Sequence, residues 1–289
     1  MTDISDFTEI MEIMADTDSA DLADTEGKGN IHHAWGMPIA TNNLSTYMNA
    51  KSDYRFLVVG DSISKGVVYN EDQGKYSILD SNYVAILQNS LKGIIFNAAK
   101  FGNTVKRGIE RLNQDLSKAK PDIVLIEFGG NDCDFNWKQV ASDPMAEHMP
   151  NTDFNVFAKT LRETIHALKN NNIVPVLMTL PPLDADRYFQ WVSKNSTELG
   201  KNILTWLGSV NKIYWWQERY NSVIVSLAQE TRTRWIDVRS AFLKTPDFTQ
   251  LLCIDGIHPN EAGHKIIAQK VIDYLKRDYL FLLKDTTSG

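Results

Sequence analysis

From Tyr54 onward, short apolar runs alternate with segments in which apolar residues recur at helical spacing. The runs that fit buried strands are 56–59, 94–96, 123–128, 174–179 and 235–238. The segments with helical periodicity are 83–91, 105–116, 154–169, 214–228 and 261–275. Such alternation predicts an α/β domain with a parallel sheet and helices on both faces. In sheets of this kind, ligands bind beyond the carboxyl ends of the strands.

The first thirty of the 289 residues differ sharply from the remainder in charge. They contain nine acidic residues and one lysine, a net charge of −8, so the remainder carries +2 of the overall −6. Few apolar residues lie among these acids, and such composition does not support a packed core. We therefore predict an acidic extension and linker over 1–50 and one domain over 51–289. Neither part has a basic stripe, so a nucleic-acid partner is not expected.

The sequence shows no feature of export or membrane insertion. The N-terminus lacks a basic start and an apolar run followed by a small-residue cleavage site. No stretch approaches the roughly 18–20 apolar residues that a membrane span needs. Only two cysteines, Cys133 and Cys253, are present, so disulfides are not expected to hold the fold together. We expect a cytoplasmic protein without a membrane span, and the sequence gives no oligomeric state.

A serine follows the first predicted strand directly, in the segment Gly60-Asp61-Ser62-Ile63-Ser64. Gly60 allows a sharp turn there, and a serine at this point faces the crevice above the sheet. Asp-Ser after a strand is also common at helix starts. The segment differs from the G-x-S-x-G elbow of α/β-hydrolases because Ser64 occupies the place of the second glycine.

Two further segments supply hydrogen-bond donors near strand ends. The third strand runs into Gly129-Gly130-Asn131-Asp132, and the second strand is followed by a loop that contains Gly102. These residues fit plain turns. They also fit an oxyanion site, with the Asn131 amide and the Gly102 N–H directed at one oxygen atom.

The histidine candidate lies near the other end of the chain, in Asp255-Gly256-Ile257-His258-Pro259-Asn260. A tight turn brings Asp255 to the Nδ1–H of His258, which leaves Nε2 free to take a proton from serine. Asn260 is predicted to cap the last helix. His264 lies within that helix and is expected to be a surface or packing residue.

These four segments, in this order, resemble the four signature segments of the GDSL/SGNH hydrolases. The resemblance covers roughly residues 54–283, and Ile63 replaces the family's usual leucine. It implies a three-layer α/β/α sandwich with a five-stranded parallel sheet, the flavodoxin-like SGNH fold. It also implies catalysis by Ser62, His258 and Asp255. The Ser62 N–H, the Gly102 N–H and the Asn131 amide would then form the oxyanion hole.

The resemblance further implies a serine esterase that acts on carboxylic esters through an acyl-enzyme, without a metal or organic cofactor. Small acyl esters, among them acyl groups on carbohydrates, are the first expectation for the small-molecule substrate. Lysophospholipase or acyl thioesterase activity is the alternative, and a non-catalytic ligand-binding α/β domain is the alternative of another class. Asp61 and Asp132 are interpreted as turn and network residues.

Two other chemistries are less well supported. Phosphate binding at Gly129-Gly130 lacks the Walker lysine pattern, and a metal site of Asp255, His258 and His264 lacks the H-E-x-x-H spacing.

The segment 183–216 is too long for a simple connection and is rich in aromatic residues. Its aromatic members are Tyr188, Phe189, Trp191, Trp206, Tyr214, Trp215 and Trp216. We expect the segment to shape substrate choice, with Trp137 and Trp191 as candidate substrate-binding residues. The competing interpretation places most of these rings in the core.

Overall fold

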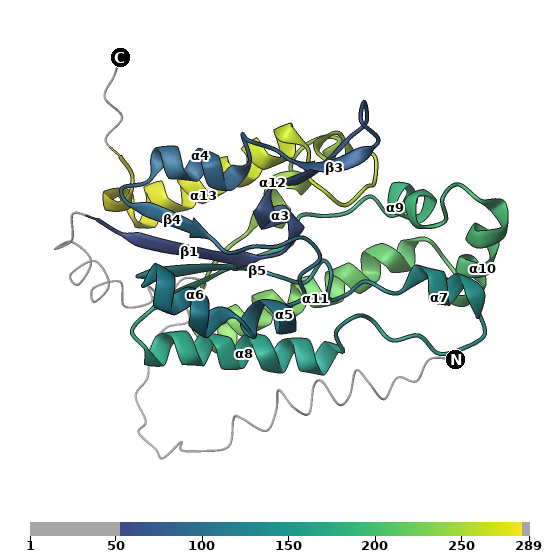
Figure 1. The fold of residues 1–289 in the computed structure, drawn as a ribbon, viewed down its shortest axis with the longest axis horizontal. Helices are drawn as coiled ribbons and strands as arrows, with labels where there is room; N and C mark the ends of the chain where they lie inside the picture. Colours follow the sequence, from purple (N-terminus) through teal and green to yellow (C-terminus); the bar gives the residue numbers. More distant parts are fainter. Residues whose placement is uncertain (1–52, 285–289) are drawn as a thin grey trace, which may run out of the picture. The chain divides into compact units, whose positions relative to one another are not determined.

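The computed structural model describes residues 53–284, in which five strands form a wholly parallel sheet in the order β4-β1-β5-β6-β7 (Figure 1). The strands are β1 (Arg55–Gly60), β4 (Ile94–Asn97), β5 (Ile123–Glu127), β6 (Val174–Met178) and β7 (Arg234–Ile236). They correspond to the five predicted strands, so the predicted α/β class and five-stranded parallel sheet are confirmed.

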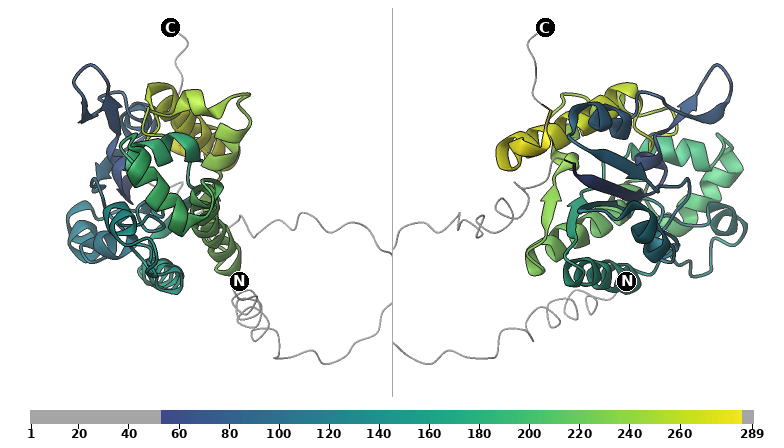
Figure 2. Two further views of the ribbon diagram at one scale, coloured as in Figure 1. Left: turned by 90° about the vertical axis from the view of Figure 1, so that its right-hand side faces the viewer. Right: turned by 60° about the vertical axis from the view of Figure 1, so that its left-hand side comes forward.

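Helices cover both faces of this sheet, which confirms the three-layer arrangement (Figures 1 and 2). One face carries α4 (Tyr83–Ser90), α12 (Val238–Leu243) and α13 (Glu261–Asp278). The other face carries α5 (Val105–Ile109), α6 (Leu112–Ala119), α8 (Phe154–Asn170) and α11 (Asn211–Glu230). The remaining helices are α3 (Ser62–Lys65), α7 (Trp137–Ser142), α9 (Ala185–Val192) and α10 (Thr197–Leu207), with short 3₁₀ turns at Phe248–Leu251 and Leu280–Leu282.

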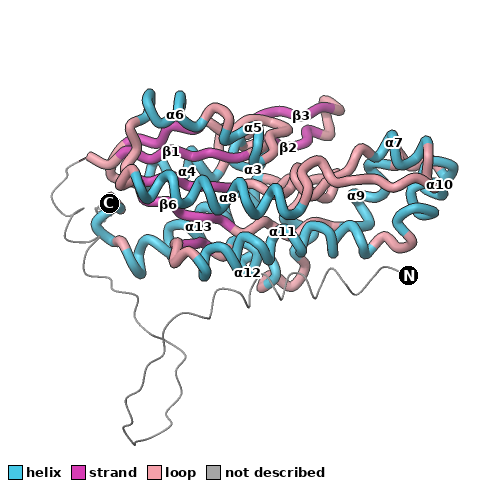
Figure 3. Tube along the Cα trace, turned by 90° about the horizontal axis from the view of Figure 1, so that it is seen from below, coloured by secondary structure: helices cyan, strands magenta, loops and turns pink. Residues whose placement is uncertain are grey.

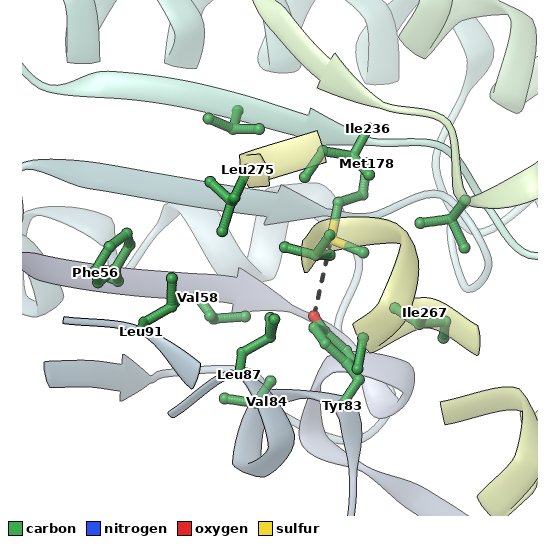
Figure 4. Packing of buried hydrophobic residues seen from close by; sticks show 14 of the residues in the cluster. Phe56, Val58, Tyr83, Val84, Leu87, Leu91, Met178, Ile236, Ile267 and Leu275 are labelled. Carbon is green, nitrogen blue, oxygen red and sulfur yellow. Dashed lines mark hydrogen bonds between the residues drawn. The ribbon is translucent and has the colours of Figure 1, made fainter. Parts of the chain in front are cut away.

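The two core layers follow from the alternation of side chains along each strand. On β1, Phe56 and Val58 belong to the layer under α4 and α13, whereas Leu57 and Val59 belong to the layer under α8 and α11. Because both faces are covered, the strand is apolar at consecutive positions rather than at alternate ones. Figure 4 shows the first layer, where the Tyr83 hydroxyl also approaches the Met178 sulfur at 3.9 Å.

Beyond the carboxyl ends of the strands, α7, α9 and α10 form a third apolar cluster with the start of α11 (Figure 3). This region contains the aromatic segment 183–216, which folds into helices rather than one long loop. The residue before each of two helices caps it. The Asp184 side chain accepts from backbone N–H groups at the start of α9, and the Ser196 side chain accepts from one at the start of α10.

Two local features differ from the sequence interpretation. The helix expected over 105–116 is interrupted between α5 and α6. Within α5, a Cβ at Gly108 would lie 2.2 Å from the Phe128 ring, so the first helix packs closely on the end of the sheet. The second feature is a hairpin of β2 (Val67–Asn70) and β3 (Lys75–Ile78), which stands out from the domain in Figure 2.

The predicted extension over 1–50 lies outside the described residues, and the domain boundary at 51 stays a prediction. Within 53–284, no helix combines the length and the apolar character that crossing a membrane requires. The expected cytoplasmic location also stays a prediction.

We predict that Phe157→Ala lowers the free energy of unfolding by about 3–5 kcal/mol, because it leaves a cavity in the layer under α8. Phe157 is fully buried, and its ring lies 5.0 Å from that of Tyr220. Denaturant unfolding measures the change. Val156→Ala is the matched control on the same helix, since Val156 is 45% exposed and its replacement should change the free energy by less than about 0.5 kcal/mol. Equal effects of the two replacements would contradict the packing described here.

Candidate active site

Ser62 is the first residue of α3, directly beyond the carboxyl end of β1. Asp61 caps this short helix by accepting from the Ile63 N–H at 2.9 Å. Glycine is required at position 60, because a Cβ there would lie 2.7 Å from the Ser64 hydroxyl and 2.8 Å from the Glu127 carbonyl oxygen. The close approach of β1 to β5 thus fixes where the Ser62 hydroxyl stands.

Asp255 and His258 occupy one tight turn. Gly256, with φ of +75°, allows the chain to reverse, and one Asp255 oxygen accepts from the backbone N–H groups of Ile257 and His258 at 3.1 Å each. The other oxygen accepts from His258 Nδ1–H at 2.6 Å. The Ser62 hydroxyl lies 2.9 Å from His258 Nε2, so the three predicted residues form one hydrogen-bonded chain.

This arrangement determines the charge on Asp255. Burial raises the pKa of its carboxyl group, but the bond from His258 and the two backbone N–H groups outweigh burial, and the net pKa lies below the ordinary value. Asp255 is therefore ionised across the neutral pH range. An ionised carboxylate at Nδ1 leaves His258 with the tautomer whose Nε2 accepts a proton.

Tyr76, on the hairpin strand β3, is a site residue that the sequence analysis missed. Its hydroxyl donates to Asp255 Oδ2 at 3.1 Å, the same oxygen that His258 Nδ1–H uses. Its ring lies 5.1 Å from the His258 ring in an edge-on arrangement. The available signal was the pair 67–70 and 75–78 around a glycine-containing turn, a pattern typical of hairpins.

The loop that contains Gly102 lies against the same site. Asn103 donates to the Gly60 carbonyl oxygen at 3.2 Å, and the Phe101 ring stacks on the His258 ring at 6.1 Å. Gly102 itself has φ of +71°, and the space where a Cβ would stand is open. Its role as an oxyanion donor stays a prediction.

Asn131 follows β5 and borders the pocket at Ser62. Its Nδ2 donates to Asp61 Oδ2 at 3.2 Å. An amide nitrogen carries two hydrogens, so one remains for a ligand after this bond. Asp61 therefore both caps the helix of the serine and orients the amide of Asn131.

Asp61 meets a second buried carboxyl group, Glu127, which stands opposite Gly60 in the parallel register. Burial raises the pKa of both groups, and the charge of Glu127 raises that of Asp61 further. Glu127 Oε2 accepts from the Ser64 hydroxyl at 2.9 Å, but Oε1 has no N–H or hydroxyl donor within 53–284. A proton on Asp61 that faces Glu127 accounts for the raised pKa of Asp61 and for the Glu127 oxygen that has no other donor. An acidic residue inside a buried apolar run was the signal for Glu127 in the sequence.

Asp132 is also buried, and it ties neighbouring elements together. Its carboxylate accepts from the Val105 N–H at 3.0 and 3.1 Å and from the Thr152 hydroxyl at 2.7 Å. Burial raises its pKa to about 6 despite these donors. Cys133 and Cys253 are buried as free thiols, and burial raises the pKa of both. Both thiols therefore stay protonated at neutral pH.

A pocket of about 60 Å³ opens at Ser62, Asn131 and His258. Its walls are largely apolar and come from the segment after Asn131 and from 183–216. They include Phe135, Trp137, Leu183, Tyr188, Ile213 and Trp216. Two carboxyl groups, Asp61 and Asp134, also line the pocket. The sequence analysis did not single out Asp134.

The two candidate substrate-binding tryptophans differ in position. Trp137 lines this pocket, although it is largely buried. Trp191 is not among the pocket-lining residues and packs instead on the hairpin, with its ring 4.8 Å from that of Tyr69 and 6.2 Å from that of Tyr76. Of the other aromatic residues in 183–216, Trp215 is 51% exposed. Substrate binding by Trp137 and Trp191 stays a prediction.

His264 is fully buried and packs on Tyr83, so the expectation of a packing residue holds and that of a surface residue does not. Its Nδ1 accepts from the Tyr83 N–H at 3.4 Å, and burial lowers its pKa to about 4. The hypothetical metal set of Asp255, His258 and His264 is not brought together, because His258 is engaged by Asp255 and Ser62. Across 53–284, no group of three or more acidic, histidine or cysteine side chains is arranged to hold a metal ion.

Comparison with known proteins identifies the family of the chain. Residues 58–266 match the GDSL-like lipase/acylhydrolase family. An acetylxylan esterase from Geobacillus stearothermophilus is 27% identical over 77% of this chain and 94% of its own length. Thioesterase 1/protease 1/lysophospholipase L1 from Escherichia coli is 27% identical over 81% of this chain and 88% of its own.

Solved structures agree as well. The crystal structure of an acetylxylan esterase from G. stearothermophilus aligns with a TM-score of 0.54 at 25% identity, over 82% of this chain and the whole of that one. The chain is a carboxylic ester hydrolase that belongs to the GDSL-like lipase/acylhydrolase family.

Proposed function

We propose that Ser62 is the nucleophile of ester hydrolysis, with His258 as its general base and Asp255 as the group that orients the imidazole. The observation that carries this proposal is the unbroken series of contacts from the Ser62 hydroxyl to His258 Nε2 at 2.9 Å and from Nδ1–H to Asp255 at 2.6 Å. These are the distances and the order that nucleophilic catalysis by serine requires.

In the first step, Ser62 Oγ attacks the ester carbonyl carbon while its proton passes to His258 Nε2. The tetrahedral intermediate carries its negative charge on the former carbonyl oxygen, and the N–H groups of Ser62 and Gly102 and the free amide hydrogen of Asn131 stabilise it. Collapse breaks the bond to the alcohol, which takes the proton from His258. Water then attacks the acyl-Ser62 ester by the same route in reverse and releases the acid.

The bond between Asn131 and Asp61 supports this assignment. It holds one hydrogen of the amide, so the other has a fixed direction before substrate arrives. Preorganised donors of this kind stabilise charge without reorganising during the reaction. The raised pKa of Asp61 disfavours full negative charge beside the site of the oxyanion.

Short acyl esters are the substrates that we propose, with acetyl groups on carbohydrates among them. A pocket of about 60 Å³ is less than half the size of an engineered cavity that holds benzene, about 150 Å³. It therefore has room for a few heavy atoms. The similarity to an acetylxylan esterase supports the same choice. The similarity to a thioesterase and lysophospholipase keeps long-chain acyl substrates as the alternative.

A series of p-nitrophenyl esters from acetate to decanoate distinguishes a preference for short acyl groups from a preference for long ones. A maximum of kcat/KM at two to four acyl carbons supports the proposal, whereas a maximum at eight or more carbons supports the alternative.

The nucleophile is tested by Ser62→Ala, which we expect to abolish both p-nitrophenyl acetate hydrolysis and labelling by a fluorophosphonate. The fold should persist, because only a small hydroxyl is removed. Ser222→Ala is the matched control, since Ser222 is exposed on α11 and its hydroxyl bonds only to the backbone of its own helix. Wild-type turnover in the folded Ser62 variant would refute the assignment.

Asn131→Ala is predicted to lower kcat by roughly 10²–10³-fold with a smaller change in KM, because the amide bonds the oxyanion more strongly than the ground-state carbonyl. Steady-state kinetics on one short ester measures the changes in kcat and in KM separately. Asn155→Ala, on the exposed start of α8, is the control. An effect confined to KM would assign Asn131 to substrate binding instead.

Tyr76→Phe is predicted to lower kcat/KM a few-fold, because the Asp255 oxygen that faces His258 loses one of the two side-chain donors that hold it in place. Burial and the nearby Asp255 raise the pKa of Tyr76, so its hydroxyl is a donor at neutral pH. Steady-state kinetics on one short ester measures the change.

The control for this prediction is Tyr69→Phe in the same hairpin. The Tyr69 ring packs on Tyr76 and Trp191, but its hydroxyl makes no hydrogen bond within 53–284. An unchanged kcat/KM in the Tyr76 variant would show that its hydroxyl does not hold Asp255 for the reaction.

A further inference from the structure

Asp134 is a carboxylate that the proposed reaction does not use, and it lies in the wall of the pocket that opens at Ser62. One of its oxygens accepts from the Trp137 indole Nε1–H at 2.7 Å, and the other accepts from the Tyr188 hydroxyl at 2.6 Å. The side chain is therefore held in one orientation by two aromatic residues that line the same pocket. Both bonds are short, as expected of bonds to an ionised acceptor.

These two bonds leave part of the acceptor capacity of Asp134 unused. A carboxylate has about four lone-pair sites, and here each oxygen has one side-chain donor, while the Phe135 backbone N–H also bonds to the carboxyl group. No lysine or arginine in 53–284 forms an ion pair with Asp134. Burial raises its pKa to about 6, so the group is mainly ionised at neutral pH. Because Asp134 lines the pocket, a ligand in it can donate a hydrogen bond to the acceptor site that remains.

The size of the pocket limits what that ligand can be. About 60 Å³ admits a short group of a few heavy atoms, and the walls of Phe135, Leu183 and Trp216 suit its carbon skeleton. A plain alkyl chain in this space would displace water from Asp134 and donate no hydrogen bond in its place. A short chain that carries a hydroxyl group would satisfy both the apolar walls and the carboxylate.

We propose that Asp134 determines substrate specificity by accepting a hydrogen bond from a hydroxyl group of the substrate, so that short esters with a hydroxyl near the ester bond are preferred over alkyl esters. The inference rests on ester hydrolysis at Ser62 and defines the class of ester. The hydroxyl belongs either to the acyl group, as in a hydroxy acid, or to the alcohol, as in a polyol. The recognition chemistry is the same in both cases.

Two matched pairs of esters test the proposal and distinguish these sources. Ethyl 3-hydroxybutyrate against ethyl butyrate places the hydroxyl in the acyl group, and glycerol 1-monoacetate against propyl acetate places it in the alcohol. Acid release in a pH-stat gives kcat/KM for each. For at least one pair we expect the wild-type chain to favour the hydroxyl ester by roughly 10-fold or more, the worth of one hydrogen bond to a charged group.

Asp134→Asn removes the charge of this side chain and keeps one oxygen acceptor. Asp134→Leu removes both the charge and the acceptor. The amide fits the same space, since the Tyr188 hydroxyl can accept from its N–H₂ while the Trp137 N–H still donates to its oxygen. We expect the preference to fall several-fold in Asp134→Asn and to be lost in Asp134→Leu, mainly through KM for the hydroxyl ester. A residue that acted only on the fold would reduce both esters of a pair alike and leave their ratio unchanged.

Asp186→Asn is the matched control, because Asp186 is exposed on α9, the helix that carries Tyr188, and lies outside the pocket. The proposal is overturned if neither pair shows a wild-type preference, or if Asp134→Asn, shown by circular dichroism to be folded, keeps the wild-type ratio. Failure of the proposed reaction looks different, since the wild-type chain would then hydrolyse none of the four esters and Ser62 would not take up a fluorophosphonate.

Discussion

Parallel pairing of β1 with β5 brings Gly60 opposite Glu127, so the segments that follow these two strands leave the sheet side by side. Asp61 and Ser62 follow one strand, and Asn131 follows the other after two glycines. The Asn131–Asp61 bond joins the two segments directly. A shift of this register by one residue would separate the serine from the amide, because successive residues point to opposite faces of a sheet. The core beneath the site therefore fixes its geometry.

The histidine reaches the site from the other end of the domain, 196 residues beyond Ser62. Its turn is held at the base by bonds from the Cys253 N–H to the His258 carbonyl oxygen at 2.8 Å and from the Asn260 N–H to the Leu251 carbonyl oxygen at 2.9 Å. Asn260 then caps α13, which packs on α4 and the sheet. The position of His258 is thus determined by a local turn and by the docking of the last helix.

The elements that could be predicted from sequence are those whose signal is local. Buried parallel strands are apolar on both faces, and the Asp255-to-His258 spacing itself implies a turn. Tyr76 and Asp134 could not be found in this way, because Tyr76 bonds to Asp255 and Tyr188 bonds to Asp134 across 179 and 54 residues of sequence. The break between α5 and α6 was missed because α5 is limited by its close approach to Phe128, a tertiary constraint that overrides helical periodicity.

Five carboxyl groups lie in the segments that build the site: Asp61, Glu127, Asp132, Asp134 and Asp255. None of them forms an ion pair with a lysine or arginine within 53–284. Their surroundings give them different charges. Asp255 is buried, but the imidazole and two backbone N–H groups bond to it, so its pKa is lowered and its negative charge faces His258, where the proposed reaction would develop positive charge. Asp61 is buried beside another acid, Glu127, so its pKa is raised and negative charge is disfavoured beside the amide that would bind an oxyanion. The surroundings thus favour negative charge where the proposed reaction would make a cation and disfavour it where that reaction would make an anion.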